Sequence, residues 1–398
     1  MKMNEFFDEL LMVPGPSQIS NRVIQAMVRP AIAHYDPVFF KIFDECCESL
    51  KKIFQTKNSD VIILPGTGRI SLESAIASVI EPGDEVLNIV DGLFSEWISE
   101  MIKTYRGKPI DLKFEWGKPI NLEKIKEKLE ENNRIKMVTV VHSESSTGVL
   151  HPIKEIGKII NKYDKLYFVD AISSLGAIDI KTDEWGIDFC CAASQKCLSA
   201  PIGLAILSIS EKAWDYMKNR REPPYTFSLN LIKWKQNFIR KPVPRPYPEY
   251  PSTHLVYALH EAINIILEEG LENVFKRHKI VGEAVRAGIK AIGLKLFPEE
   301  SIASDTVTVI RTPNNINVEE ILRIMRDKHH VFITGAPPSP HLRGKVFRIG
   351  HMGLNASPIY IIPTLSALEE TLKELGLNFD FGIGIETARK ILYRYRIY

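Results

Sequence analysis

The chain has 398 residues, 45% of them hydrophobic and 25% charged, which is enough for two ordinary domains with sizeable cores. Its formal net charge of +2 gives no reason to expect a nucleic-acid partner or an acidic membrane surface. No apolar run reaches the roughly 18 residues that span a bilayer. Acidic residues near the N-terminus also argue against a secretory signal.

The cysteines indicate a reducing compartment. Cys46-Cys47, Cys190-Cys191 and Cys197 make an odd number, with adjacent pairs and no Cys-x-x-Cys spacing. Neither a disulfide framework nor a zinc site fits this arrangement, and burial as small hydrophobic side chains is the better interpretation. We therefore expect a cytoplasmic protein without a bound metal.

Strand-like runs alternate with helical patterns along the first half of the chain, which is typical of βαβ units with a parallel sheet. The predicted strands are Val61–Leu64, Glu85–Val90, Met137–Val141, Leu166–Val169 and Ala205–Ser208. After a proline-rich stretch at 241–251, a long helix from about Thr253 leads to a smaller α+β domain. We predict a large domain at 17–255 and a small domain at 256–398 that includes residues 1–16.

A glycine-bracketed hydroxyl, Gly66-Thr67-Gly68, lies between the first predicted strand and a helical pattern. The glycines let the backbone approach a ligand, and the N–H groups at a helix start favour an anion. Thr67 adds a hydroxyl donor. Strand-glycine-helix turns are common in α/β proteins, so this phosphate-binding pattern is weak by itself.

Asp170 and Lys196 are candidates for cofactor chemistry. Asp170 ends a hydrophobic strand, at the sheet edge where ligands of parallel sheets bind, although a carboxylate there can also simply cap the next turn. Lys196 lies among aliphatic and small residues, which should lower its pKa towards the neutral amine that Schiff-base chemistry needs. Most lysines, however, are solvated surface charges.

Taken together, these motifs resemble the fold-type I pyridoxal-phosphate enzymes, and among them the class V aminotransferases of the alanine–glyoxylate and serine–pyruvate kind. The resemblance runs from Val13–Ser17 through His142–Val149 to Arg348–Gly353. It implies an α/β fold whose large domain has a mainly parallel sheet, and pyridoxal 5'-phosphate as the cofactor. It also implies that Lys196 forms the Schiff base and carries the proton, while Asp170 pairs with the pyridinium nitrogen.

The resemblance assigns further cofactor contacts. Phe94 matches the aromatic residue that stacks on the cofactor ring, and Ile172 matches the aliphatic residue under the other face. Ser145 falls where relatives place a hydroxyl near the ring oxygen, with Thr147 close enough to share that task, and Gln195 helps to hold the phosphate. Plain alternatives are core packing for Phe94 and turn formation for the hydroxyl residues.

Arg348 is the candidate for the substrate carboxylate, because a guanidinium recognises a planar anion with two hydrogen bonds. A surface salt bridge is the alternative. Tyr35 lies in a segment that relatives bring near the substrate, with core packing as the equal alternative.

The proline-rich stretch predicts a homodimer with its sites at the interface. In relatives the corresponding loop crosses the interface and donates Tyr and Thr hydroxyls to the partner's cofactor phosphate, so Tyr247 and Tyr250 are the candidates here. The usual Thr-Pro is Tyr250-Pro251 in this chain, so the threonine contact needs another residue. A stiff linker between domains is the alternative.

The resemblance implies ping-pong transfer of an amino group from a small amino acid, of the alanine or serine type, to glyoxylate or pyruvate. Several segments, among them His34–Pro37 and Pro358–Tyr360, look more like pyridoxamine–pyruvate aminotransferase. That relative carries an acidic residue where Thr67 stands and an arginine where Ser339 stands. Because Thr67 accepts a phosphate, we expect the conventional reaction. Pyridoxamine–pyruvate transfer and a lyase of the same fold remain alternatives.

Overall fold

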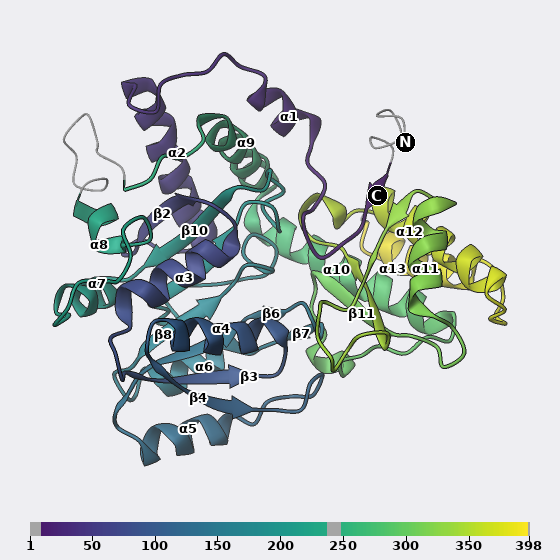
Figure 1. The fold of residues 1–398 in the computed structure, drawn as a ribbon. Coiled ribbons are helices and arrows are strands. Elements are labelled where there is room, and N and C mark those ends of the chain that lie inside the picture. Colours follow the sequence, from purple (N-terminus) through teal and green to yellow (C-terminus); the bar gives the residue numbers. More distant parts are fainter. Residues whose placement is uncertain (1–8, 237–247, 397–398) are drawn as a thin grey trace.

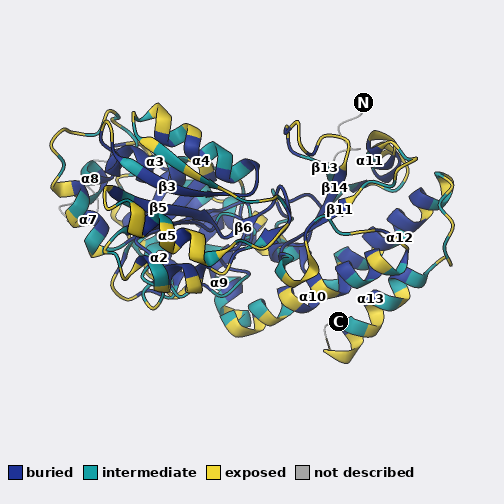
Figure 2. Ribbon diagram, turned by 90° about the horizontal axis from the view of Figure 1, so that it is seen from below, coloured by how far each residue is buried: buried dark blue, intermediate teal, exposed yellow. Residues whose placement is uncertain are grey.

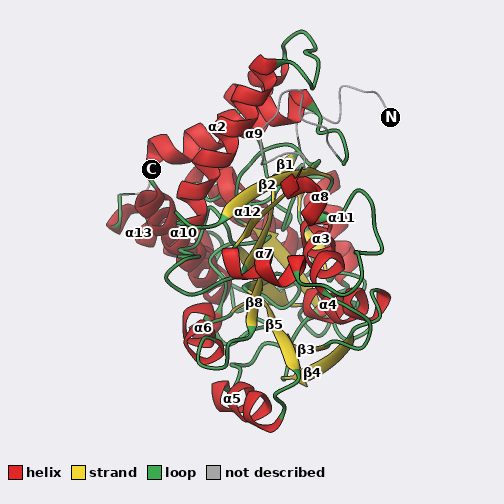
Figure 3. Ribbon diagram, turned by 90° about the vertical axis from the view of Figure 1, so that its left-hand side faces the viewer, coloured by secondary structure: helices red, strands yellow, loops and turns green. Residues whose placement is uncertain are grey.

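A seven-stranded sheet forms the centre of the large domain in the computed structural model, which describes residues 9–236 and 248–396 (Figure 1). The strands lie in the order β2-β10-β9-β8-β5-β3-β4, with β2 and β4 at opposite ends of the sheet (Figure 3). All are parallel except β10. Their bounds are β2 Asp60–Pro65, β3 Glu85–Val90, β4 Lys108–Lys113, β5 Ile135–Val141, β8 Leu166–Asp170, β9 Phe189–Ala193 and β10 Leu204–Ile209. The predicted α/β fold with a mainly parallel sheet is confirmed.

Helices cover both faces of this sheet, and their apolar sides give the buried layers seen in Figure 2. Every residue of β8 is buried, as expected for a strand between two helical layers. The helix α2 shows how local sequence sets an element: the carboxylate of Asp36 accepts a hydrogen bond from Val38 N (2.7 Å), and Gln55 ends the helix in a left-handed conformation. The helices are α1 Asn21–Met27, α2 Pro37–Phe54, α3 Gly68–Val79, α4 Leu93–Thr104, α5 Leu122–Glu131, α6 Ile153–Ile160, α7 Glu211–Lys218, α8 Leu231–Trp234 and α9 Thr253–Glu269.

One predicted strand runs against the expected direction. The segment Ala205–Ser208 belongs to β10, which is antiparallel to both of its neighbours, so the βαβ interpretation is wrong there. Residues 194–203 connect β9 directly to β10 and form no helix. A parallel pair needs a crossover of about a dozen residues or more, usually through a helix, so this short connection can only make an antiparallel pair.

The small domain combines a three-stranded antiparallel sheet with helices. The sheet order is β11-β14-β13, and a short parallel pair joins β1 to β12. Figure 1 shows the N-terminal segment passing from this domain to α1 on the large domain. The elements are β1 Leu10–Leu11, α10 Leu271–Ala291, β11 Val307–Arg311, α11 Val318–Asp327, β12 Val331–Phe332, β13 Thr334–Gly335, β14 Val346–Gly350, α12 Pro358–Glu374 and α13 Ile383–Arg394.

Two hydrophobic cores indicate where the domains divide. The larger core contains the buried residues of the sheet and of α9, and it extends to Val274. The smaller core begins again at Ile280 on the same helix, α10, and includes Met12 from the N-terminal segment. Because the buried residues of α9 belong to the larger core, we propose that the boundary predicted at 255/256 lies instead within α10, between Val274 and Ile280.

Two short strands complete the description near the site. The strands β6 Ser143–Glu144 and β7 Val149–Leu150 form a hairpin directly after β5.

Across the described ranges, the longest apolar helices fall short of what a membrane crossing requires.

Candidate active site

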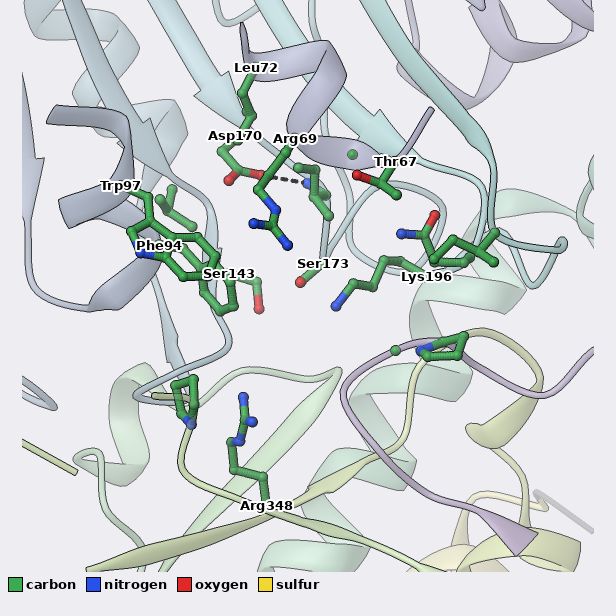
Figure 4. Close-up of a pocket in the computed structure, with 18 of the residues that line it drawn as sticks. Thr67, Arg69, Leu72, Phe94, Trp97, Ser143, Asp170, Ser173, Lys196 and Arg348 are labelled. Atoms are coloured by element: carbon green, nitrogen blue, oxygen red, sulfur yellow. Dashed lines mark hydrogen bonds between the residues drawn. The ribbon is translucent and has the colours of Figure 1, made fainter. Parts of the chain in front are cut away.

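A cavity of about 450 Å³ lies at the carboxyl edge of the large sheet, where the small domain closes over it. The ends of β2, β3, β5, β8 and β9 converge on this edge because these strands are parallel. Lys196, Phe94 and Arg348 reach into the same space from different walls (Figure 4). The lining consists of Gly15, Pro16, Thr67, Gly68, Arg69, Leu72, Phe94, Trp97, Met101, Val141, Ser143, Asp170, Ile172, Ser173, Gln195, Lys196, Ile202, Thr334, Ala336, Pro337, Pro338 and Arg348.

The start of α3 forms a cradle for an anion. Thr67 is the N-cap residue, and its side chain makes no capping hydrogen bond, so its hydroxyl is available to a ligand together with the N–H groups of the first turn. A Cβ at Gly68 would lie 2.8 Å from Ile172 Cδ1 and 3.0 Å from Ala193 Cβ, so a larger residue there would displace its neighbours at the cavity floor. Gly66 holds φ at +134°, which favours glycine as well.

Gln195 adds an unsatisfied polar atom to this cradle. Its Oε1 is buried and has no hydrogen-bond partner within the part of the chain that the structure describes. Buried polar atoms in native proteins are nearly always paired, so an orphaned one at a cavity wall points to a bound ligand or water. The cradle and the free Thr67 hydroxyl together fit a phosphorylated group, to which the amide N–H of Gln195 can donate.

Asp170 is placed to meet a positively charged donor. It ends β8 and is 4% exposed, and among the described residues only Ile172 N donates to its carboxylate, at 2.9 Å to Oδ1. Burial raises the pKa of Asp170 to about 6, while that hydrogen bond and the charge of Lys196 act in the opposite direction. The second carboxylate oxygen can therefore accept from a protonated ring nitrogen, a contact that would restore the ordinary acidity of the group.

Lys196 is partly buried, and its amine lies in the cavity wall. Burial and repulsion from Arg348 together lower the pKa of Lys196 to about 8, although Cys197 and Asp170 act to raise it. Its Nζ donates to the carbonyl of Pro14, in the N-terminal segment. A Cβ at Gly15 would overlap the lysine side chain, so the segment can pass this closely only with glycine there. A substantial neutral fraction near pH 8 suits Lys196 for nucleophilic attack on an aldehyde.

Aromatic and aliphatic side chains form the remaining walls. Phe94 lies in the first turn of α4 and packs edge-on against Trp97, with ring centroids 5.2 Å apart. Ile172 lines the cavity from the turn after Asp170. These positions agree with ring-facing roles for Phe94 and Ile172.

Arg348 enters from β14 of the small domain and is 7% exposed. Its Nε donates to Gly335 O at 2.9 Å, and its Nη1 donates to Ser145 O at 3.2 Å. Within the described ranges no carboxylate forms an ion pair with Arg348, and Nη2 has no protein hydrogen bond. Burial lowers the pKa of Arg348 to about 10, so the guanidinium stays charged at neutral pH and can bind an incoming anion.

Some predicted site residues do not line the cavity. Ser145 offers its backbone carbonyl to Arg348, and the Thr147 hydroxyl donates to Glu144 O at 3.3 Å. Ser143 lines the cavity instead, and its hydroxyl bonds to Ser304 Oγ at 2.8 Å. The ring-oxygen contact proposed for Ser145 and Thr147 stays a prediction.

Tyr35, predicted to lie near the substrate, and Tyr250, predicted to lie at the dimer interface, are found elsewhere. Tyr35 and Tyr250 are each 61% exposed, and both pack against the ring of His34, with centroids 5.1 Å and 4.2 Å away. Neither lines the cavity of this chain. Tyr247 lies outside the described residues.

Several lining residues were missed, although the sequence holds a signal for some of them. Phe94, Trp97 and Met101 follow the i, i+3, i+7 spacing that places side chains on one helix face. No local sequence pattern marks Thr334 and Pro337 as cavity residues. They reach the cavity only because the small domain packs against the large domain in the folded chain.

The arrangement of lysine, aspartate and anion cradle agrees with what comparison with known proteins finds. The family described as "Aminotransferase class-V" matches residues 10–337. This chain belongs to the class-V aminotransferases. It is therefore an aminotransferase that uses pyridoxal phosphate, and the residues described above fit that cofactor.

Individual relatives match along almost the entire chain. An uncharacterized aminotransferase of Methanocaldococcus jannaschii is 41% identical, over 97% of this chain and 98% of its own. The crystal structure of ureidoglycine–glyoxylate aminotransferase from Bacillus subtilis matches with a TM-score of 0.92 and 33% identity, over 97% of this chain and 98% of that one. Pyridoxamine–pyruvate aminotransferase from Mesorhizobium loti matches with a TM-score of 0.92 and 30% identity, over 99% and 100%.

Proposed function

We propose that this aminotransferase moves the amino group of a small amino acid, of the alanine or serine type, to glyoxylate or pyruvate in two half-reactions. The observation that carries the proposal is the placement of Lys196 and Arg348 in one cavity of about 450 Å³, with the amine and the guanidinium on different walls (Figure 4). Of the two arginines that line the cavity, Arg69 packs over the Trp97 ring, whereas Arg348 has an Nη2 without a hydrogen bond among the described residues and suits one carboxylate. A cavity that also holds the cofactor leaves room for a small side chain.

When bound, pyridoxal phosphate supplies an electron-withdrawing ring that stabilises negative charge at the substrate Cα. We propose that Thr67, Gly68 and Gln195 hold its phosphate, that Asp170 keeps its ring nitrogen protonated, and that Phe94 packs on its ring. Arg348 then orients the substrate by its carboxylate. Lys196 would hold the cofactor through its Nζ, and the same amine would carry the proton that leaves the substrate Cα.

A panel of donors and acceptors tests this proposal. The purified holoenzyme should transfer the amino group of alanine or serine to glyoxylate or pyruvate, followed by the keto acid formed and by the cofactor absorbance. Free pyridoxamine with pyruvate belongs in the panel, because strong activity there without retained phosphate cofactor would overturn the role of Thr67. Aldehyde release without an acceptor would instead indicate a lyase.

We further propose a cytoplasmic homodimer. The free thiols of all five cysteines suit a reducing compartment. Tyr35 and Tyr250 form an exposed aromatic cluster with His34, and the cavity residue Ile202 is itself 54% exposed. Exposed apolar groups at a site mark an interaction surface, and a second copy would cover them. Sedimentation should give twice the chain mass of 45.2 kDa, whereas a fully active monomer would contradict the proposal.

A further inference from the structure

Glu144 is a buried carboxylate immediately behind the cavity, and the cofactor and substrate contacts proposed above do not use it. It ends the short strand β6, next to the cavity residue Ser143, and its relative exposure is 0%. Carboxylates are almost never fully buried without a partner. Among the described residues Glu144 forms no ion pair, and it accepts three hydrogen bonds instead.

Two of these bonds come from Ser146, and one of them links Glu144 to Arg348 through a peptide group. Glu144 Oε1 accepts from Ser146 N at 3.1 Å and from the Ser146 hydroxyl at 2.5 Å. The N–H of Ser146 and the carbonyl of Ser145 belong to the same planar peptide, and that carbonyl accepts from Arg348 Nη1 at 3.2 Å. A carboxylate that accepts the N–H polarises the peptide and makes its carbonyl a stronger acceptor. The carboxylate therefore fixes the orientation of the group that holds the guanidinium.

The third bond fixes the start of α4. Glu144 Oε2 accepts from Ser95 N at 3.0 Å, one of the N–H groups of the first turn that have no partner inside the helix. The Ser146 hydroxyl oxygen accepts a hydrogen bond from a second N–H group of this turn, that of Leu93, at 3.0 Å. Negative charge is favourable at a helix N-terminus. Phe94 lies between these two anchored residues, so the same carboxylate also sets the position of the aromatic ring.

The charges around Glu144 agree with this role. Burial and the neighbouring Asp91 together raise the pKa of Glu144 to about 7, against the hydrogen bonds from Ser146 and Ser95, which act to lower it. Asp91 Oδ2 lies 3.0 Å from His151 Nε2, an ion-pair distance without the geometry of a hydrogen bond, so its charge is partly offset. Glu144 in turn helps to keep Arg348 protonated without touching it. Nη2 of Arg348 is thereby left for a ligand.

We propose that Glu144 is a positioning residue that aligns the carboxylate-binding Arg348, through the Ser145–Ser146 peptide, with the helix start that carries Phe94. The proposal rests on the proposed function, because it needs Arg348 to bind the substrate carboxylate. Its consequence is that substrate affinity depends on a side chain that touches neither substrate nor cofactor.

The test uses the cofactor-loaded protein and propionate, which has the carboxylate of alanine without the amine. Propionate affinity is measured by calorimetry, and covalent cofactor attachment by absorbance. Glu144→Gln keeps the size of the side chain, but its amide NH2 group must face at least one of the three groups that donate to Glu144, which are Ser95 N, Ser146 N and the Ser146 hydroxyl. Glu144→Gln should weaken propionate binding and raise KM for the amino-acid substrate by roughly ten-fold each. This is the effect expected when a hydrogen bond to a charged group is lost. Cofactor attachment should persist.

Two further variants separate positioning from general damage. Ser146→Ala removes one bond to Glu144 and should weaken propionate binding in the same direction by a smaller factor. Ser208→Ala is the matched control, because Ser208 on β10 is also a buried serine but its hydroxyl has no hydrogen-bond partner among the described residues, so affinity should not change.

A double-mutant cycle gives the decisive outcome. In an Arg348→Met background, Glu144→Gln should cause almost no further loss of affinity, since the effect is transmitted through the arginine. An equal loss in both backgrounds, or no loss in the wild-type background, would overturn the inference while leaving the proposed function intact. A wild-type protein that binds no propionate would remove the carboxylate role of Arg348, and this inference with it.

Discussion

Replacement of Arg348 is the most informative perturbation of substrate binding. The guanidinium is 7% exposed, is held by two backbone carbonyls, and forms no ion pair within the described chain. An incoming carboxylate therefore meets a poorly solvated charge that is already oriented. Loss of a hydrogen bond to a charged group costs about 1.5–3 kcal/mol, so Arg348→Met should lower kcat/KM by roughly 10- to 100-fold.

The same variant makes a sharper prediction about the two half-reactions. Donor and acceptor occupy one site in turn, so Arg348→Met should raise KM for both by similar factors, with a smaller change in kcat. Arg348→Lys should be nearly as poor, because an ammonium cannot bond both Gly335 O and Ser145 O while also presenting a donor to the ligand.

The assay is steady-state kinetics with each substrate varied in turn, together with the cofactor absorbance to show that the site is loaded. Arg343→Gln is the matched control, since Arg343 is an exposed arginine close to the same strand and does not line the cavity. Unchanged KM values in Arg348→Met, or an increase for only one of the two substrates, would refute the reasoning.

Three other predictions concern the cofactor site. Burial lowers the pKa of Lys196 from 10.5 in the unfolded chain to about 8 in the fold, so between pH 8 and 10.5 the unfolded chain holds a proton that the folded chain has lost. Below pH 8 both states are protonated, and the charged amine destabilises the cofactor-free fold by about 3 kcal/mol. Lys196→Met should accordingly raise the melting temperature of the cofactor-free protein at pH 7, and the gain should shrink as the pH rises from 8 towards 10.5; a gain that does not depend on pH would contradict this. Thr67→Glu should weaken pyridoxal phosphate binding at least roughly ten-fold in a fluorescence titration, because a carboxylate at the cradle repels the phosphate, whereas Thr67→Ser should bind normally. Asp170→Asn should keep the cofactor attached but lower kcat about 100-fold or more, since the amide cannot hold the ring nitrogen protonated; kinetics close to wild type would show that Asp170 only caps its turn.

Local patterns were enough to predict much of the fold, and the failures have physical causes. The five predicted strands are all present because their apolar runs are buried between helical layers. The edge strand β4, Lys108–Lys113, was missed because it is polar, largely uncovered and contains a proline. The strand β9, Phe189–Ala193, was not counted as a strand because it is short and two of its five residues are alanines, which are depleted in strands.

The candidate site shows a similar division. Thr67 and Asp170 could be predicted because Thr67 follows the predicted strand β2 and Asp170 ends the predicted strand β8, so their positions depend on local sequence and strand direction. Lys196 could be predicted from its small and aliphatic neighbours and from the family motif around it. Residues on the opposite wall, such as Gly15 and Pro337, come from segments far away in sequence that meet only when the small domain closes. The role of Glu144 depends on which way one peptide group points, which no sequence pattern specifies.

Reduction of the cofactor-loaded protein with borohydride, followed by peptide mass spectrometry, tests the central assignment most directly. Borohydride converts the bond between the cofactor aldehyde and a lysine into a stable adduct, whose position can be read from the peptide masses. The account predicts one adduct, on Lys196. An adduct on a different lysine, or none in protein that carries the cofactor absorbance, would contradict it.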